Sequence, residues 1–124
     1  MSYLRGRGQN GLRRKTVAIG IDPLKNLTTG GDNIAIGSAG PLDALTTGQN
    51  NIGIGQGTLG ASTTGCNNLA MGQTALSAAV TTGSNNIAMG TNTLDAVTCG
   101  FRNIAIGAGA LGSSTTGCHN IGIG

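Results

Sequence analysis

Cys118 and His119 are the residues whose chemistry comes closest to catalysis, because a thiolate beside an imidazole can act as a nucleophile. The two are adjacent in the chain, and adjacent residues of an extended segment point to opposite sides. His119 is the only histidine of the sequence. We therefore expect it to be a surface residue, with an ion held by three copies on a symmetry axis as the alternative.

Two glycine-rich segments, 55–60 and 107–112, fit the pattern Gly-x-Gly-x-x-Gly. That pattern binds a pyrophosphate only when a strand precedes it and a helix follows. Here a Thr-Thr-Gly segment follows instead, and the four aspartates lack the spacing of a calcium loop. The sequence contains no pair of nucleophile and base. It therefore predicts no enzyme, no cofactor and no metal site.

Asparagine recurs at one position of a regular pattern, and each copy precedes a short segment of the type Ile-Ala-Ile-Gly. Stacked asparagine amides can form a ladder of hydrogen bonds along a rod. We predict this structural role, with sugar binding by the same amides as the alternative. The six residues are Asn33, Asn51, Asn68, Asn86, Asn103 and Asn120.

Successive copies of this pattern begin 17 or 18 residues apart, and a degenerate copy begins at Thr16. A strict period of this length is typical of a stacked array. The Ile-x-Ile segments alternate as short strands do, and the repeats have no helical spacing over three turns. The sequence therefore predicts an all-β protein, a parallel β solenoid or β-prism with coils of 17–18 residues over residues 16–124.

The residue between the two apolar strand residues is always alanine or glycine, as at Ala35. A solvent-exposed face would tolerate larger polar residues there, so we expect the strands to be buried on both faces. Each coil also has few large aliphatic side chains for its length. We therefore predict that the small-residue face packs against identical chains, in an intertwined or side-by-side homotrimer.

Glycine and cysteine occupy fixed positions at the corners of the repeat. We expect a positive φ both at the glycine of each Thr-Thr-Gly segment, such as Gly48, and at the glycine that ends each strand, such as Gly37. The odd number of cysteines argues against a disulfide framework. We interpret Cys66 and Cys118, which share one repeat position, as buried small residues, with interchain contacts as the alternative. The sequence assigns no role to Cys99.

Residues 1–15 contain five of the seven lysines and arginines, whereas the repeats are close to neutral. Such a segment gains little by folding alone, so we predict an extended N-terminal leader that orders on a partner protein. The basic patch is short and has one aromatic residue, so we expect no nucleic-acid binding. No apolar run is long enough to insert in a membrane. The predicted anchoring residues are Tyr3, Leu4, Arg5, Arg7, Arg13, Arg14 and Lys15.

The pattern Thr-Thr-Gly-x-x-Asn-Ile-Ala-Ile-Gly-x-x-Ala-Leu over residues 16–124 resembles the repeats of bacteriophage tail-fibre and related fibre proteins. It is also similar to the shorter head repeats of trimeric autotransporter adhesins, in which Ala-Ile-Gly marks each coil. The resemblance implies a trimeric, parallel β architecture. Autotransporters also carry a signal peptide, a coiled-coil stalk and a membrane anchor. Because none of these is recognisable here, we expect a virion component.

We therefore expect a structural protein, the shaft of a tail or capsid fibre, made in the host cytoplasm and located in the virion. Residues 1–15 would anchor it to a baseplate, tail or capsid protein, and the fibre would contribute to host attachment. One alternative is a surface adhesin whose repeats bind a host glycan directly. Another is an ice-binding solenoid, suggested by the threonine columns, although two adjacent threonines at a corner point to opposite sides.

Overall fold

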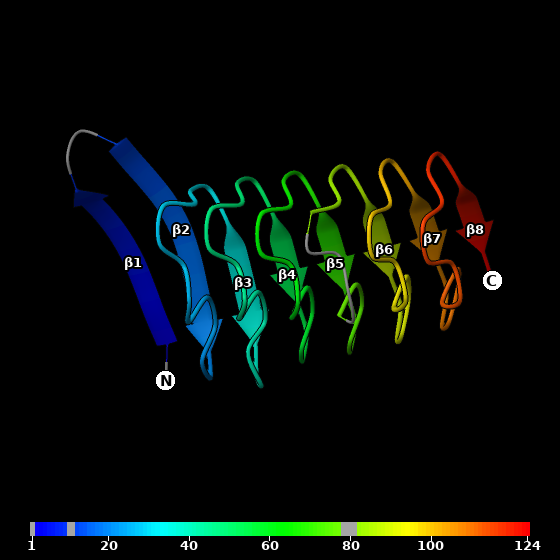
Figure 1. The fold of residues 1–124 in the computed structure, drawn as a ribbon. Helices are drawn as coiled ribbons and strands as arrows, with labels where there is room; N and C mark the ends of the chain where they lie inside the picture. Colours follow the sequence, from blue (N-terminus) through cyan, green and yellow to red (C-terminus); the bar gives the residue numbers. More distant parts are fainter. Residues whose placement is uncertain (1, 10–11, 78–81) are drawn as a thin grey trace.

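The protein is a rod of stacked coils with one short strand in each coil (Figure 1). The structure is a computed structural model that describes residues 2–9, 12–77 and 82–124, with the backbone alone at 2–9 and 12–14. The described residues contain no helix, and eight strands form one sheet in chain order. Their bounds are β1 Ser2–Gln9, β2 Leu12–Gly20, β3 Ile34–Gly37, β4 Ile52–Ile54, β5 Leu69–Met71, β6 Ile87–Met89, β7 Ile104–Ile106 and β8 Ile121–Ile123. The prediction of an all-β parallel solenoid is confirmed, with about six coils.

Strands β2 to β8 are parallel, and equivalent residues of successive repeats lie opposite one another. Ala35, for example, is opposite Gly53, and Gly53 is opposite Ala70. The period of the sequence therefore becomes a set of columns along the rod. The extra residue of the second coil lies between Gly37 and Leu42, outside the strand, so the register of the sheet is kept.

The turn that follows each strand is also stacked on its neighbours. The Leu42 N–H donates to the carbonyl of Thr58 over 2.9 Å, and the Leu59 N–H donates to the carbonyl of Ala75 over 3.0 Å. The leucine of each turn adopts a left-handed backbone, at roughly 1–2 kcal/mol, which is similar to the 1.5–3 kcal/mol that its burial contributes. These leucines, with φ between 51° and 56°, are Leu24, Leu42, Leu59, Leu76, Leu94 and Leu111.

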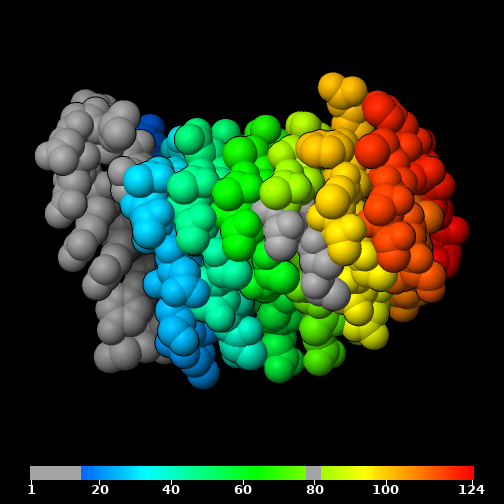
Figure 2. Space-filling view, viewed as in Figure 1, coloured from blue at the N-terminus to red at the C-terminus, as the bar shows by residue number. Residues whose placement is uncertain are grey.

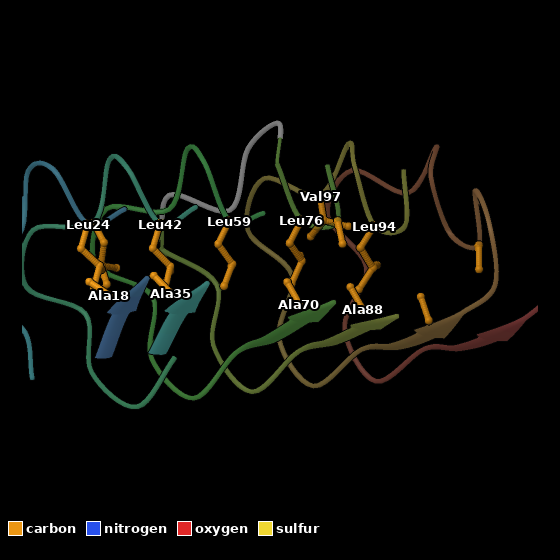
Figure 3. Close-up of a cluster of buried hydrophobic side chains, with 14 residues drawn as sticks. Ala18, Leu24, Ala35, Leu42, Leu59, Ala70, Leu76, Ala88, Leu94 and Val97 are labelled. Atoms are coloured by element: carbon orange, nitrogen blue, oxygen red, sulfur yellow. The ribbon is translucent and has the colours of Figure 1, made fainter. Parts of the chain in front are cut away.

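The hydrophobic core lies inside each coil, between the strand and the leucine turn. Figure 3 shows the strand alanines on one side of this core and the turn leucines on the other. A Cβ atom added at Gly53 would lie 2.9 Å from Thr58 Oγ1 and 3.3 Å from Leu42 Cγ. The middle residue of each strand is small because the chain's own turn packs on it. The fully buried alanines of this column are Ala35, Ala70, Ala88 and Ala105.

This packing corrects the prediction that the small-residue face meets identical chains. Ala88, for example, has no exposed surface within a single chain, so no second chain can contact it. Alternation separates the small residue from its two apolar neighbours, but it does not show which of the two sides lies inside the coil. The chain turns back over the middle residue of the strand, and the two flanking apolar residues are left on the outside.

The two corner glycines have different physical roles. The glycine that ends each strand has a positive φ, 147° at Gly37 and 129° at Gly55, which confirms that prediction. The glycine of the Thr-Thr-Gly segment does not, so the same prediction is wrong for Gly48 and Gly65. A Cβ atom at Gly65 would lie 2.4 Å from the carbonyl oxygen of Gly83. The corner therefore requires glycine because adjacent coils approach closely.

The first two strands form an antiparallel hairpin at one end of the rod (Figure 1). Ser2 pairs with Ile19, and Gln9 pairs with Leu12. Strand β2 has nine residues, and it runs across the boundary predicted between residues 15 and 16. The division into a leader and a shaft stays a prediction.

Candidate interaction surfaces

The repeated asparagines form a continuous ladder of side-chain amides inside the rod. Asn68 Nδ2 donates to Asn51 Oδ1 over 3.1 Å and to the Gly83 carbonyl over 2.9 Å. Asn68 Oδ1 accepts from the backbone N–H and from Nδ2 of Asn86, over 3.0 and 3.1 Å. Each amide therefore connects its coil to the coil before and to the coil after. The same pattern runs through Asn33, Asn51, Asn68, Asn86, Asn103 and Asn120.

The ladder leaves the four inner amides, those of Asn51, Asn68, Asn86 and Asn103, no free group for a ligand. Asn51 is fully buried, both hydrogens of its Nδ2 are donated and its Oδ1 accepts two bonds. A buried amide with every group paired stabilises the stack, because adjacent coils cannot separate without breaking several bonds. A sugar cannot reach this column, so glycan binding through these amides has no support in the geometry.

The outer face of the sheet is an apolar strip that follows the rod. The residues on either side of the buried alanine point outward, and their side chains are half-buried by contact with neighbouring coils. Met89 and Ile106 are 37% and 40% exposed. No charged or polar residue interrupts these two columns. We call the outer strip the residues Val17, Ile19, Ile34, Ile36, Ile52, Ile54, Leu69, Met71, Ile87, Met89, Ile104, Ile106, Ile121 and Ile123.

The corner before each strand carries exposed polar columns. The first threonine of each pair bonds along the rod, as Thr46 Oγ1 does to the Thr63 carbonyl over 3.0 Å, while the second, such as Thr47, is exposed. In the pairs Thr46–Thr47 and Thr63–Thr64 the first threonine is partly buried and the second is exposed, whereas both are exposed in Thr28–Thr29 and Thr115–Thr116. The residue before each ladder asparagine has a positive φ, and this column consists of Asp32, Asn50, Asn67, Asn85, Arg102 and His119.

The cysteines and the histidine lie at these corners. Cys118 and Cys99 are exposed and Cys66 is partly exposed, so the interpretation of Cys66 and Cys118 as buried residues is wrong. The small corner positions that must be buried are glycines instead, because the coils approach there. His119 is exposed, as expected for a surface histidine. Among the described residues, no three His, Cys, Asp or Glu side chains gather as a metal site.

The predicted anchoring residues all lie on the terminal hairpin. Tyr3, Leu4, Arg5 and Arg7 belong to β1, and Arg13, Arg14 and Lys15 belong to β2. In the backbone register Arg7 is opposite Arg14. Lys15 is exposed, and the other six side chains lie outside the described part of the chain. No helix of the described residues is long and apolar enough to cross a membrane.

The comparisons with known proteins identify no relative. No family model matches the chain, and no curated protein and no solved structure is significantly similar to it.

The sequence prediction did not identify which side of each strand faces the inside of the coil and which side faces outward. The signal was present, because a leucine follows each strand at a nearly constant distance and must pack against the inner face of the sheet. Leu42, for example, packs against Gly53, the middle residue of the next strand. The corner column was also missed as a feature. Its signal is the change from Asp or Asn to Arg102 and then to His119.

Proposed function

We propose that this chain is the shaft of a virion fibre and that three copies associate through the outer strip. The single observation that supports this proposal is the uninterrupted apolar face along a regular rod. A contiguous exposed apolar face of this kind marks an interaction site.

The regular spacing of the strip favours an identical chain as the partner. Its side chains recur once per coil, and a matching surface must have the same repeat to meet every row. A second copy of this rod has that repeat by construction, and symmetry places equal coils at equal height. A globular partner would match only a few rows. The resemblance to fibre repeats favours three chains around an axis over two chains face to face.

The proposed fibre is anchored in the particle through residues 1–15. The hairpin lies at one end of the rod, and this end contains five of the seven basic residues. A baseplate, tail or capsid protein with an acidic surface is the proposed socket, and three copies of the basic end would bind it with higher avidity than one. The fibre would then extend from the virion and contribute to host attachment.

Light scattering coupled to size exclusion tests the assembly. The expected mass is three times the 12.1 kDa of one chain. Ile52→Lys places a charge in the middle of the outer strip and should give a folded monomer, since a lone outer side chain can reach water. Asn50→Lys, at an exposed corner two residues earlier, is the matched control and should remain a trimer. A folded wild-type monomer or dimer would contradict the trimer.

Removal of residues 1–15 tests the anchoring. The shortened chain should still assemble, while its incorporation into particles should fall at least tenfold because the basic contacts are lost. A second variant keeps the full length but removes the positive charge of the basic end, so it separates the effect of charge from the effect of length. In this variant glutamine replaces Arg5, Arg7, Arg13, Arg14 and Lys15. Incorporation at the wild-type level by both variants would show that the shaft, and not its basic end, contacts the particle.

A further inference from the structure

The corner column changes its chemistry near the last two strands. Its first four residues are Asp or Asn, which tolerate a left-handed backbone better than other residues do. Arg102 has a φ of 58° at the same position, although arginine does not favour the left-handed backbone, and this conformation lowers the stability of the fold by roughly 1–2 kcal/mol. Arg102 is also the only lysine or arginine after Lys25.

Three residues of unlike chemistry lie on two stacked corners here, and we call them the corner patch: Phe101, Arg102 and His119. Arg102 Nη1 lies 3.2 Å from His119 Nε2. A guanidinium can only donate, so a hydrogen bond between the two side chains requires the imidazole to accept at Nε2. Phe101 is 42% exposed beside them. The described residues offer the guanidinium no carboxylate, so most of its five N–H groups face solvent.

The backbone holds this patch in a fixed position. The Arg102 N–H donates to the Ser84 carbonyl over 3.2 Å, and the His119 N–H donates to the Phe101 carbonyl over 3.0 Å. The three side chains therefore project from two stacked corners of a hydrogen-bonded rod. A preorganised group of this kind loses less entropy on binding than a loop does.

We infer that the corner patch binds a carboxylate-bearing sugar. A guanidinium pairs with a carboxylate through two parallel hydrogen bonds, and the exposed ring of Phe101 can cover the apolar C–H face of a sugar. Asn85, the exposed residue before Arg102 in the corner column, offers an amide to the sugar hydroxyls. The inference goes beyond the structural role of the shaft and does not depend on it.

The small size and single positive charge of the corner patch favour an acidic sugar as the ligand over a protein or a nucleic acid. Three side chains at one corner cover much less than the roughly 800 Å² that each partner buries in a standard protein interface. A nucleic acid or another polyanion requires several cations, and Arg102 is isolated from all others in the sequence. A single carboxylate attached to a ring with an apolar face matches the one guanidinium and the one aromatic residue.

Titration of the full chain with trigalacturonate, followed by NMR or calorimetry, tests the inference. The carboxyl-reduced form of the same oligosaccharide should bind at least tenfold more weakly, because it lacks the partner of the guanidinium. Arg102→Asn restores the residue that other coils have at this position, so the variant should fold and should lose at least tenfold in affinity. Phe101→Ser, which restores the residue of the preceding coil, should lose about fivefold or more.

A charge-matched variant separates a local site from general attraction. Arg102→Asn combined with Asn50→Arg keeps the net charge and moves the guanidinium three coils along the same column, away from Phe101. It should bind no better than Arg102→Asn. The inference is overturned if wild type shows no binding at millimolar trigalacturonate, if the double variant binds like wild type, or if the reduced sugar or triglutamate binds equally well.

Discussion

The two faces of each strand differ in what covers them. In β6 the central Ala88 is fully buried inside the rod, while Ile87 and Met89 point outward. The inner face accepts only small residues because a leucine packs on it. The outer face accepts isoleucine, leucine or methionine, because its side chains stack on equivalent residues of the coils above and below. The residue type on the inner face is thus limited by the space under the leucine, and the residue type on the outer face is set by stacking on equivalent residues of neighbouring coils.

This difference separates folding from assembly. The inner columns of alanine, leucine and asparagine are complete within one chain. The side chains of the outer strip contact their equivalents in neighbouring coils, but their outward-facing surface is not covered by any other part of the described chain. Figure 2 shows the described coils as successive bands packed against one another along the rod. We expect substitutions inside a coil to change the stability of the chain and substitutions outside to change its association.

The largest effect should come from charge on the inner face. Ala88→Glu places a carboxylate where no surface is exposed and where the turn leaves no space, and it should destabilise the chain by at least about 4 kcal/mol. Ile87→Glu is the matched outer substitution, in which the carboxylate can reach water. Circular dichroism should show Ala88→Glu unfolded and Ile87→Glu folded.

Size exclusion of the same pair completes the comparison. Ile87→Glu should elute as a folded chain of 12.1 kDa, without association. A folded Ala88→Glu variant would show that the turn does not close over the strand. If both variants unfold, folding and assembly are a single event and the two faces cannot be separated energetically.

The second effect concerns two adjacent asparagines, one inside and one outside. Asn68→Ala removes the ladder bonds to Asn51 and Gly83, and it leaves buried groups of Asn86 unpaired. We expect a loss of about 4 kcal/mol, at roughly 1–3 kcal/mol for each unsatisfied group. Asn67→Ala, at the exposed corner, should cost only about 1 kcal/mol, because alanine tolerates the left-handed backbone less well. Urea denaturation of the two variants measures the difference, and equal losses would contradict a structural ladder.

The period of the sequence was sufficient to predict the class of fold. Repeats of 17 or 18 residues with Ile-x-Ile segments specify stacked strands in register, and the structure has these strands and this register. The asparagine ladder could be predicted for the same reason, since a residue that recurs at one position of every coil lies next to the equivalent residue of the adjacent coil. These features depend only on the spacing along the chain.

The direction of the two strand faces could not be read from alternation alone. Alternation separates Ile34 and Ile36 from Ala35, but it does not say which side is inside. That choice depends on where the left-handed backbone of Leu42 sends the chain, and a leucine at φ of 56° is not expected from local preference. The role of Gly48 was misassigned for a related reason, because the close approach of the next coil is a tertiary property.

The third prediction compares two glycines that resist substitution for different reasons. A methyl group at Gly65 would lie 2.4 Å from the Gly83 carbonyl oxygen, so Gly65→Ala should separate two coils at a cost of about 2–3 kcal/mol. Gly109 has φ of 71° with nothing within 4 Å of an added Cβ atom. Gly109→Ala should therefore cost only about 1 kcal/mol of backbone strain. Thermal unfolding should rank the two, and the reverse order would show that the corner is not closely packed.

The smallest effect should be a gain in stability at a buried hydroxyl. Ser62 is fully buried, and its Oγ has no hydrogen-bond partner among the described residues. It occupies a column that holds Leu45 and Val97 in other coils, where an aliphatic side chain fills the space. Ser62→Val removes the unpaired group and should stabilise the chain by about 1–2 kcal/mol.

Val97 shows that valine fits this position of the repeat. It packs beside Gly100, the glycine of its own corner, and a valine at position 62 would pack beside Gly65 in the same way. The matched outer substitution is Ser113→Val, at an exposed position of another turn, which should change stability by less than about 0.5 kcal/mol. Urea denaturation of both variants measures the pair. A loss of stability in Ser62→Val would mean that the hydroxyl is bonded to water inside the coil, and the inner columns would then not be dry.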